Sequence, residues 1–274
     1  MDFPELLKAI LLGAIQGLTE FLPISSSGHL VIGSKLLEFE QHSVAFDVFL
    51  HLGSLLAVLL VFRKEIAAMI LAPIFWLRGS LEEKDRMYLL WDLYVIIASV
   101  PAVLVGLFLK DRVEVLFSSL PLVYSMLAIT AFLMLTSGYL QDRGKELGWF
   151  RALLIGCAQA CAIMPGLSRS GSTIFMGMLL GVDREVVARF SFIMSIPVIF
   201  GAAVLQIGDI AGQQFTEGSL INLVGGTVMA AVSGYFAIVL LLDIVRRNRL
   251  QYFGYYCLVV ALTGFALLFF SNVS

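Results

Sequence analysis

Two short stretches of this sequence gather polar and ionisable side chains inside long apolar runs. Residues 16–29 read Gln-Gly-Leu-Thr-Glu-Phe-Leu-Pro-Ile-Ser-Ser-Ser-Gly-His, and residues 165–173 read Pro-Gly-Leu-Ser-Arg-Ser-Gly-Ser-Thr. Ionisable groups among apolar runs that could lie in a membrane are costly, so they indicate a functional site by default. We therefore interpret the two stretches as parts of one site.

The first stretch contains the groups of an activated nucleophile. Gln16 and Glu20 are four residues apart and share a helix face. Ser26 and His29 follow on a second helix after Pro23, and a hairpin can bring Glu20 near both of them. A carboxylate or an imidazole could then take the proton of a serine hydroxyl. The alternative is that Glu20 and His29 only pair with each other to satisfy the packing of the hairpin.

The second stretch is suited to an anion. Pro165 and Gly166 end one helix and make a turn, and the serines begin the next helix, which leaves backbone N–H groups free at its N-terminus. Together with the guanidinium of Arg169, these groups suit a phosphate. The alternative is that the serines are only helix caps and that Arg169 pairs with a carboxylate.

The next apolar run contains Asp47, His51 and Ser54, for which we prefer a structural interpretation. A lone histidine that faces a neighbouring helix more often makes a packing hydrogen bond, so we expect no functional role for His51.

The elements that position these groups belong to a membrane protein. Of 274 residues, 59% are hydrophobic and 14% charged, and the mean hydropathy is +0.95; soluble domains carry about 25% charged residues. The net charge of −2 gives no sign of nucleic-acid binding. Six runs reach the roughly 20 residues that a spanning helix needs, namely 44–62, 91–109, 121–140, 186–207, 220–244 and 253–270.

Four shorter runs, 1–22, 25–37, 149–164 and 170–180, are broken by Pro, Gly and Ser and predict two re-entrant helical hairpins. We place residues 66–77 at the interface or in a loop, and 79–86 in a loop. The fold class is thus all-α and polytopic, with six transmembrane helices plus two re-entrant hairpins.

Basic residues predict the orientation. Thirteen Lys and Arg fall in loops assigned to the cytoplasmic side and four, Lys8, Lys35, Lys110 and Arg112, on the other. Both termini then face outward, the first hairpin enters from outside and the second from the cytoplasm.

An internal repeat relates the two stretches. Shifting the sequence by 143 residues aligns Ala9–Gly28 with Ala152–Gly171, with seven of twenty positions identical. Opposite entry sides make this an inverted-topology repeat, with repeat 1 at about 1–140 and repeat 2 at about 145–274 of a single integral membrane domain, 1–274. Ser26 aligns with Arg169 and Glu20 with Ile163, so the first copy keeps the acid–base groups and the second the cation.

At these motifs the chain resembles the undecaprenyl-diphosphate phosphatase family of bacteria, membrane enzymes associated with bacitracin resistance. Gln16 to Glu20, continued by Pro23 and Ser25 to His29, is similar to the first family motif, with Gln where Glu or Gln is allowed; Pro165 to Thr173 matches the second without departure. The resemblance extends over essentially the whole chain.

The resemblance implies hydrolysis of the terminal phosphate of undecaprenyl diphosphate, giving the monophosphate carrier of cell-wall synthesis, with bacitracin resistance as the expected phenotype. It implies a divalent cation, Mg²⁺ or Ca²⁺, and a multi-pass protein of the bacterial inner membrane, surrounded by membrane lipids, whose site opens to the periplasm. The oligomeric state, a homodimer included, and the preferred prenyl length stay open.

The predicted catalytic residues are Glu20, Ser26, His29 and Arg169, with Glu20 also a candidate metal ligand. The predicted substrate-binding residues are Gln16, Ser25, Ser27, Gly166, Ser168, Ser170 and Thr173. Either Ser26 or a water molecule is the nucleophile. A lipid-phosphate transporter or flippase is the alternative function, because inverted repeats with midplane hairpins are also transporter architecture.

Overall fold

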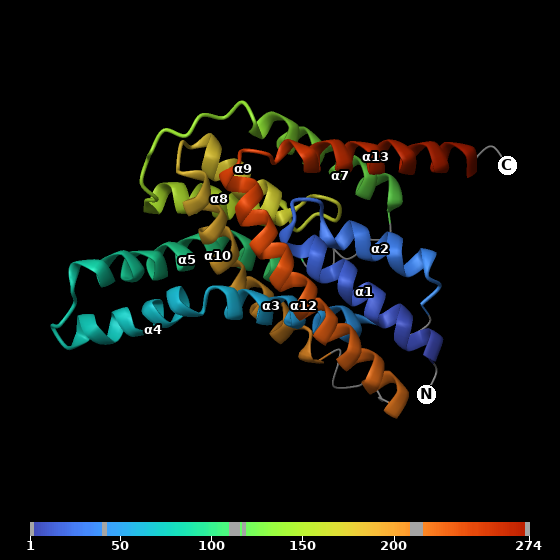
Figure 1. The fold of residues 1–274 in the computed structure, drawn as a ribbon, viewed down its shortest axis with the longest axis horizontal. Coiled ribbons are helices and arrows are strands. Elements are labelled where there is room, and N and C mark those ends of the chain that lie inside the picture. The colour runs from blue at the N-terminus through green and yellow to red at the C-terminus, as the bar shows by residue number, and fades with distance from the viewer. Residues whose placement is uncertain (1–2, 40–42, 110–115, 117–118, 209–215, 272–274) are drawn as a thin grey trace.

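The computed structural model describes residues 3–39, 43–109, 116, 119–208 and 216–271, and it shows helices joined by turns and loops, the loop at residues 138–148 being long (Figure 1). The named helices are α1 Phe3–Phe21, α2 Ser26–Leu36, α3 Val44–Val61, α4 Arg63–Leu77, α5 Glu83–Phe108, α7 Leu120–Ser137, α8 Trp149–Cys161, α9 Arg169–Leu179, α10 Arg184–Leu205, α12 Glu217–Arg246 and α13 Gln251–Ser271. The β-structure within these ranges is a single bridge between Lys145 and Val182.

Among the described residues, six helices are long and apolar enough to cross a membrane: α3, α5, α7, α10, α12 and α13. They coincide with the six predicted spans, so the prediction of an all-helical, polytopic membrane protein is confirmed. The loop predicted at 79–86 is partly wrong, because α5 already begins at Glu83. Glu83 and Asp85 lie in its first turn, where negative side chains stabilise the N-terminus of a helix.

The long helix α12 crosses the centre of the molecule against α1 and α3 (Figure 1). At the contact with α1, a Cβ added to Gly13 would collide with the backbone of Gly226, so the two helices touch backbone to backbone. Small residues allow such close packing between membrane helices. The contact fixes α1, whose C-terminal end carries Glu20.

In two helical pairs, α1–α2 and α8–α9, the second helix folds back toward the start of the first. Lys8 Nζ of α1 donates to the Glu38 carbonyl after α2 at 3.0 Å, and Lys145 N before α8 donates to the Gly181 carbonyl after α9 at 3.0 Å. The open ends of each pair therefore lie together. The two turns meet, because Ser170 Oγ donates to the Leu22 carbonyl at 3.3 Å.

The basic ends of several helices gather in one place. Arg189 near the start of α10 bonds to Glu65 of α4 at 3.0 Å and to Glu185 at 2.8 Å, and Arg246 at the end of α12 also bonds to Glu185 at 2.7 Å. Arg189 and Arg246 are among the basic residues predicted to share one side of the membrane. On the opposite side, Lys110 and Arg112 lie outside the described residues.

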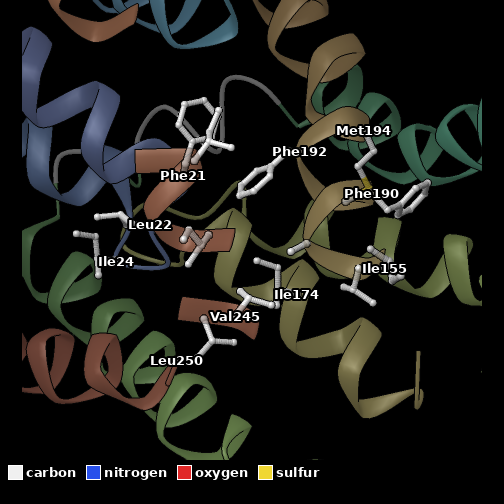
Figure 2. Packing of buried hydrophobic residues seen from close by; sticks show 14 of the residues in the cluster. Phe21, Leu22, Ile24, Ile155, Ile174, Phe190, Phe192, Met194, Val245 and Leu250 are labelled. Atoms are coloured by element: carbon white, nitrogen blue, oxygen red, sulfur yellow. The ribbon is translucent and has the colours of Figure 1, made fainter. Parts of the chain in front are cut away.

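A large apolar cluster encloses the turn between α1 and α2 (Figure 2). Phe21 meets Phe192 of α10 edge to face, with ring centroids 5.6 Å apart, an arrangement that aromatic rings prefer. Leu22 and Ile24 are buried in the same cluster. The polar residues of the turn are therefore held in an apolar environment.

Gly166 determines the shape of the turn between α8 and α9. Its φ is +94°, and an added Cβ would collide with the Val123 carbonyl. Glycine alone adopts this conformation readily, so we expect Gly166→Ala to destabilise the protein by about 1–3 kcal/mol, and more if α7 cannot move. Thermal unfolding in detergent measures the change.

Gly148→Ala is the matched control. Gly148 precedes α8 with φ −131°, and nothing lies within 4 Å of an added Cβ. Equal unfolding temperatures for the two variants would contradict the requirement for glycine at position 166.

Candidate functional site

The carboxylate of Glu20 is the centre of the candidate site. Oε1 accepts a hydrogen bond from Arg169 Nη2 at 2.6 Å, and Oε2 accepts one from Ser26 Oγ at 2.6 Å. Gln16 Nε2 also donates to Oε2, at 3.1 Å. Side chains from α1, α2 and α9 thus converge on one buried carboxylate, and the predicted residues Gln16, Glu20, Ser26 and Arg169 are brought together.

Glu20 and Arg169 form a buried ion pair between the two helical hairpins. The side chains are only 6% and 15% exposed, respectively. Each charge compensates the other, since an isolated charge at this depth would be strongly destabilised. Arg169 Nη1 and Gln16 Oε1 are buried without a hydrogen-bond partner among the described residues. One donor and one acceptor therefore remain available for a ligand.

The two turns share one pattern of capping hydrogen bonds, although the cap residues differ in backbone conformation, with φ +71° at Ser25 and −69° at Ser168. Ser25 Oγ accepts from Gly28 N at 3.4 Å and lies 3.3 Å from Ser27 Oγ. At the matching positions of the second turn, Ser168 Oγ accepts from Gly171 N at 3.1 Å and lies 3.2 Å from Ser170 Oγ. Ser26 and Arg169 consequently begin α2 and α9 at equivalent positions.

Most other residues of the second stretch are occupied in holding the hairpin. Thr173 Oγ1 lies 2.6 Å from Ser191 Oγ of α10. Thr130 of α7 donates to the Gly166 carbonyl at 3.1 Å and accepts from Ser168 N at 3.0 Å. Helix capping by the serines and pairing of Arg169 with a carboxylate, the structural alternative, are both observed, and they place the unpartnered guanidinium nitrogen in the site.

The ring nitrogens of His29 bond to neither Glu20 nor Ser26. Its Nδ1 lies 2.8 Å from the Ser25 carbonyl and its Nε2 2.8 Å from the Tyr256 hydroxyl of α13. The two rings are stacked, with centroids 5.6 Å apart. The prediction that the hairpin brings His29 to Glu20 is therefore wrong, because both ring nitrogens are bonded elsewhere.

Tyr256 controls the availability of His29. A carbonyl only accepts, so Nδ1 carries the hydrogen and Nε2 accepts from the tyrosine hydroxyl. Tyr256→Phe keeps the ring but frees Nε2, and losing one hydrogen bond of about 1 kcal/mol corresponds to about fivefold faster reaction of His29 with diethyl pyrocarbonate. Mass spectrometry of the labelled peptide measures the rate.

Tyr255→Phe is the control for this experiment, since the Tyr255 side chain is 58% exposed. If His29 reacted at the same rate in both variants, the hydrogen bond from Tyr256 would not protect it.

His51 lies next to Glu20, although the sequence pattern around it had favoured a structural role. Its Nε2 is 3.8 Å from Glu20 Oε2, and Ser54 Oγ accepts from Gln16 Nε2 at 3.4 Å. Asp47, His51 and Ser54 are spaced four and three residues apart, on one face of α3. A polar stripe on an otherwise apolar spanning helix was the signal that could have identified them.

The side chains of the site offer few free ligands for a divalent cation. The described residues contain no group of three or more His, Cys, Asp or Glu able to hold a metal ion. Both oxygens of Glu20, the expected candidate ligand, already accept hydrogen bonds. Gln16 Oε1, which belongs to the group bonded to Glu20, is one of several buried oxygens without a partner among the described residues, and Mg²⁺ and Ca²⁺ prefer oxygen ligands, with Mg²⁺ often held largely by substrate phosphates. The divalent cation stays a prediction.

Fold and site together define a polytopic helical membrane protein with a charged site buried where two helical hairpins meet. The family model for the bacitracin resistance protein BacA matches residues 9–263. The chain belongs to this family, and the predicted family membership is confirmed.

The relatives carry one name, undecaprenyl-diphosphatase. The protein of Halothermothrix orenii is 41% identical over 261 residues, which cover 94% of this chain and 96% of the relative. The protein of Syntrophotalea carbinolica is 43% identical over 265 residues, covering 95% and 98%. The protein of Methanobrevibacter smithii is 41% identical over 279 residues, covering 95% and 97%.

Proposed function

We propose that this chain hydrolyses undecaprenyl diphosphate to undecaprenyl phosphate and inorganic phosphate, the activity named for its relatives. The family is named for bacitracin resistance, and we expect this phenotype to follow from recycling of the product, the lipid carrier of cell-wall synthesis. The observation that carries the proposal is the buried cluster of Glu20, Ser26 and Arg169, which combines a nucleophile, a base and a phosphate-binding cation.

Substrate binding begins with the diphosphate displacing part of the Glu20–Arg169 ion pair. Arg169 has an unpartnered Nη1, and a guanidinium binds phosphate oxygens in a forked geometry. The polyprenyl tail stays in the surrounding lipid. A divalent cation, when bound, neutralises further phosphate charge, and Gln16 Oε1 is the protein oxygen that would contact it.

Phosphoryl transfer then proceeds to Ser26. Its Oγ forms a bond to the terminal phosphorus while the bond from that phosphorus to the bridging oxygen breaks, and undecaprenyl phosphate leaves with the bridging oxygen. The serine proton passes to Glu20 Oε2, which already accepts it at 2.6 Å. Water next cleaves the phosphoserine to release phosphate. In the competing mechanism, water attacks the substrate directly and Ser26 is only a ligand.

His29 supports this arrangement from a distance. Its bond to the Ser25 carbonyl steadies the first turn of α2, from which Ser26 projects. The role of His29 is therefore to position Ser26, and it does not act as an acid or base.

The same proposal includes the membrane topology. The hairpins α1–α2 and α8–α9 are re-entrant and belong to an inverted repeat of residues 1–140 and 145–274; the matching capping hydrogen bonds and the paired open ends support this. The protein spans the bacterial inner membrane with both termini in the periplasm, where the site opens, a direction supported by the bias of basic residues.

Phosphate release in detergent is the experiment that tests the function. Purified protein with Mg²⁺ or Ca²⁺ should release inorganic phosphate from undecaprenyl diphosphate in the absence of any membrane barrier. A transporter or flippase would bind the lipid and release none, which would reject the enzyme proposal.

A further inference from the structure

We propose that His51 is a further catalytic residue: it is the base that activates the water molecule which hydrolyses the phosphoserine at Ser26. The inference rests on the proposed function and on Ser26 as the nucleophile.

The proton balance of the reaction has a place for a second base. In the first step Glu20 receives the serine proton, and the departing undecaprenyl phosphate takes none from it. In the second step the water oxygen bonds to phosphorus, the bond from Ser26 Oγ to phosphorus breaks, and Glu20 returns its proton to Oγ. One proton of the water stays on the released phosphate, and a second base can take the other while Glu20 still holds the serine proton.

The ring of His51 is oriented for this task. Its Nδ1 lies 2.8 Å from the Asp47 carbonyl, so Nδ1 carries the hydrogen and Nε2 presents a lone pair to the site. Such a bond at the other ring nitrogen is what holds a histidine base in the correct tautomer. Nε2 is 3.8 Å from Glu20 Oε2, beyond hydrogen-bond distance, and can therefore accept a bond from water.

The position of His51 brings this base close to the nucleophile. Ser26 Oγ and His51 Nε2 lie 2.6 Å and 3.8 Å from the same oxygen, Glu20 Oε2, but only Ser26 is bonded to it. The His51 side chain is 33% exposed, against 15% for Arg169, so it is less enclosed by the protein than the arginine.

His29, the other histidine near the site, cannot serve in this arrangement. Both of its nitrogens are bonded, to the Ser25 carbonyl and to the Tyr256 hydroxyl. His51 is thus the described histidine with an unoccupied nitrogen facing the carboxylate.

The test is a rapid-mixing experiment with His51→Gln, which keeps a polar side chain but lacks the base. We expect one burst of undecaprenyl phosphate, about equal to the enzyme concentration, followed by turnover slowed about 10²–10⁴-fold. A phosphoserine at position 26 should accumulate and be seen by mass spectrometry; the double variant His51→Gln/Ser26→Ala should show none. Added imidazole should restore part of the turnover of His51→Ala.

The outcomes separate the inference from the proposed function. If the wild-type protein releases no phosphate, the proposed function fails and the inference with it. If the wild type is active while His51→Gln turns over normally, or slows without accumulating phosphoserine, the proposed function stands and the role of His51 is wrong. The unfolding temperature of each variant identifies a loss caused by misfolding, and imidazole rescue of His51→Ala then decides.

Discussion

Arg169→Gln should lower kcat/KM for phosphate release by about 10³–10⁵, the contribution of an arginine that stabilises a transferring phosphoryl group. Two effects combine in this variant. The substrate loses its guanidinium partner, and Glu20 is left buried without the 2.6 Å ion pair, which destabilises a protein by about 3–5 kcal/mol. Turnover of undecaprenyl diphosphate and thermal unfolding are measured on the same sample.

Two further variants separate catalysis from stability. Arg169→Lys keeps the charge but not the forked geometry, so its activity should be intermediate. The double variant Arg169→Gln/Glu20→Gln removes both charges and should regain stability without regaining activity. If the double variant recovered turnover, Arg169 would act only as a structural partner of Glu20.

Ser26→Ala should reduce turnover by about 10³-fold or more, as loss of a nucleophile does elsewhere. Its hydroxyl donates to Glu20 Oε2 at 2.6 Å, so the substitution removes both the attacking oxygen and the route of its proton. The measurement is the rate of phosphate release, with the unfolding temperature as a check on folding.

Ser34→Ala is a matched control on the same helix. The Ser34 hydroxyl bonds to the Val31 carbonyl at 3.3 Å, away from Glu20, so turnover should stay near that of the wild type. Substantial activity in a folded Ser26→Ala protein would favour direct attack by water, and the absence of any phosphoserine in the His51→Gln variant would agree with it.

The sequence predicted the helices better than the contacts between them. The length of an apolar run can be read directly from the sequence, and it predicted the six spans. The start of α5 at Glu83 was missed because charged residues were equated with a loop. The meeting of Glu20 with Arg169 was foreseeable in outline, because the repeat aligned two polar turns.

The orientation of each imidazole was not predictable in the same way. His29 is held by Tyr256, which is 227 residues away and carries no sequence signal for this contact. The spacing of His51 from Asp47 and Ser54 indicated a shared helix face. The interpretation instead followed the general tendency of a lone histidine to make a packing hydrogen bond. Local periodicity identifies a helix face, whereas the partner of that face depends on the packing of the whole chain.

The ion pair between Glu20 and Arg169 has a consequence for biosynthesis. The two residues are 149 positions apart in the chain, so at about 5–20 residues per second a ribosome completes Glu20 roughly seven to thirty seconds before Arg169. During that interval the carboxylate of Glu20 has no arginine partner, so burying the first hairpin is energetically unfavourable. The arrival of the second hairpin supplies the missing charge, so the first hairpin can reach its final packing only after Arg169 has been synthesised.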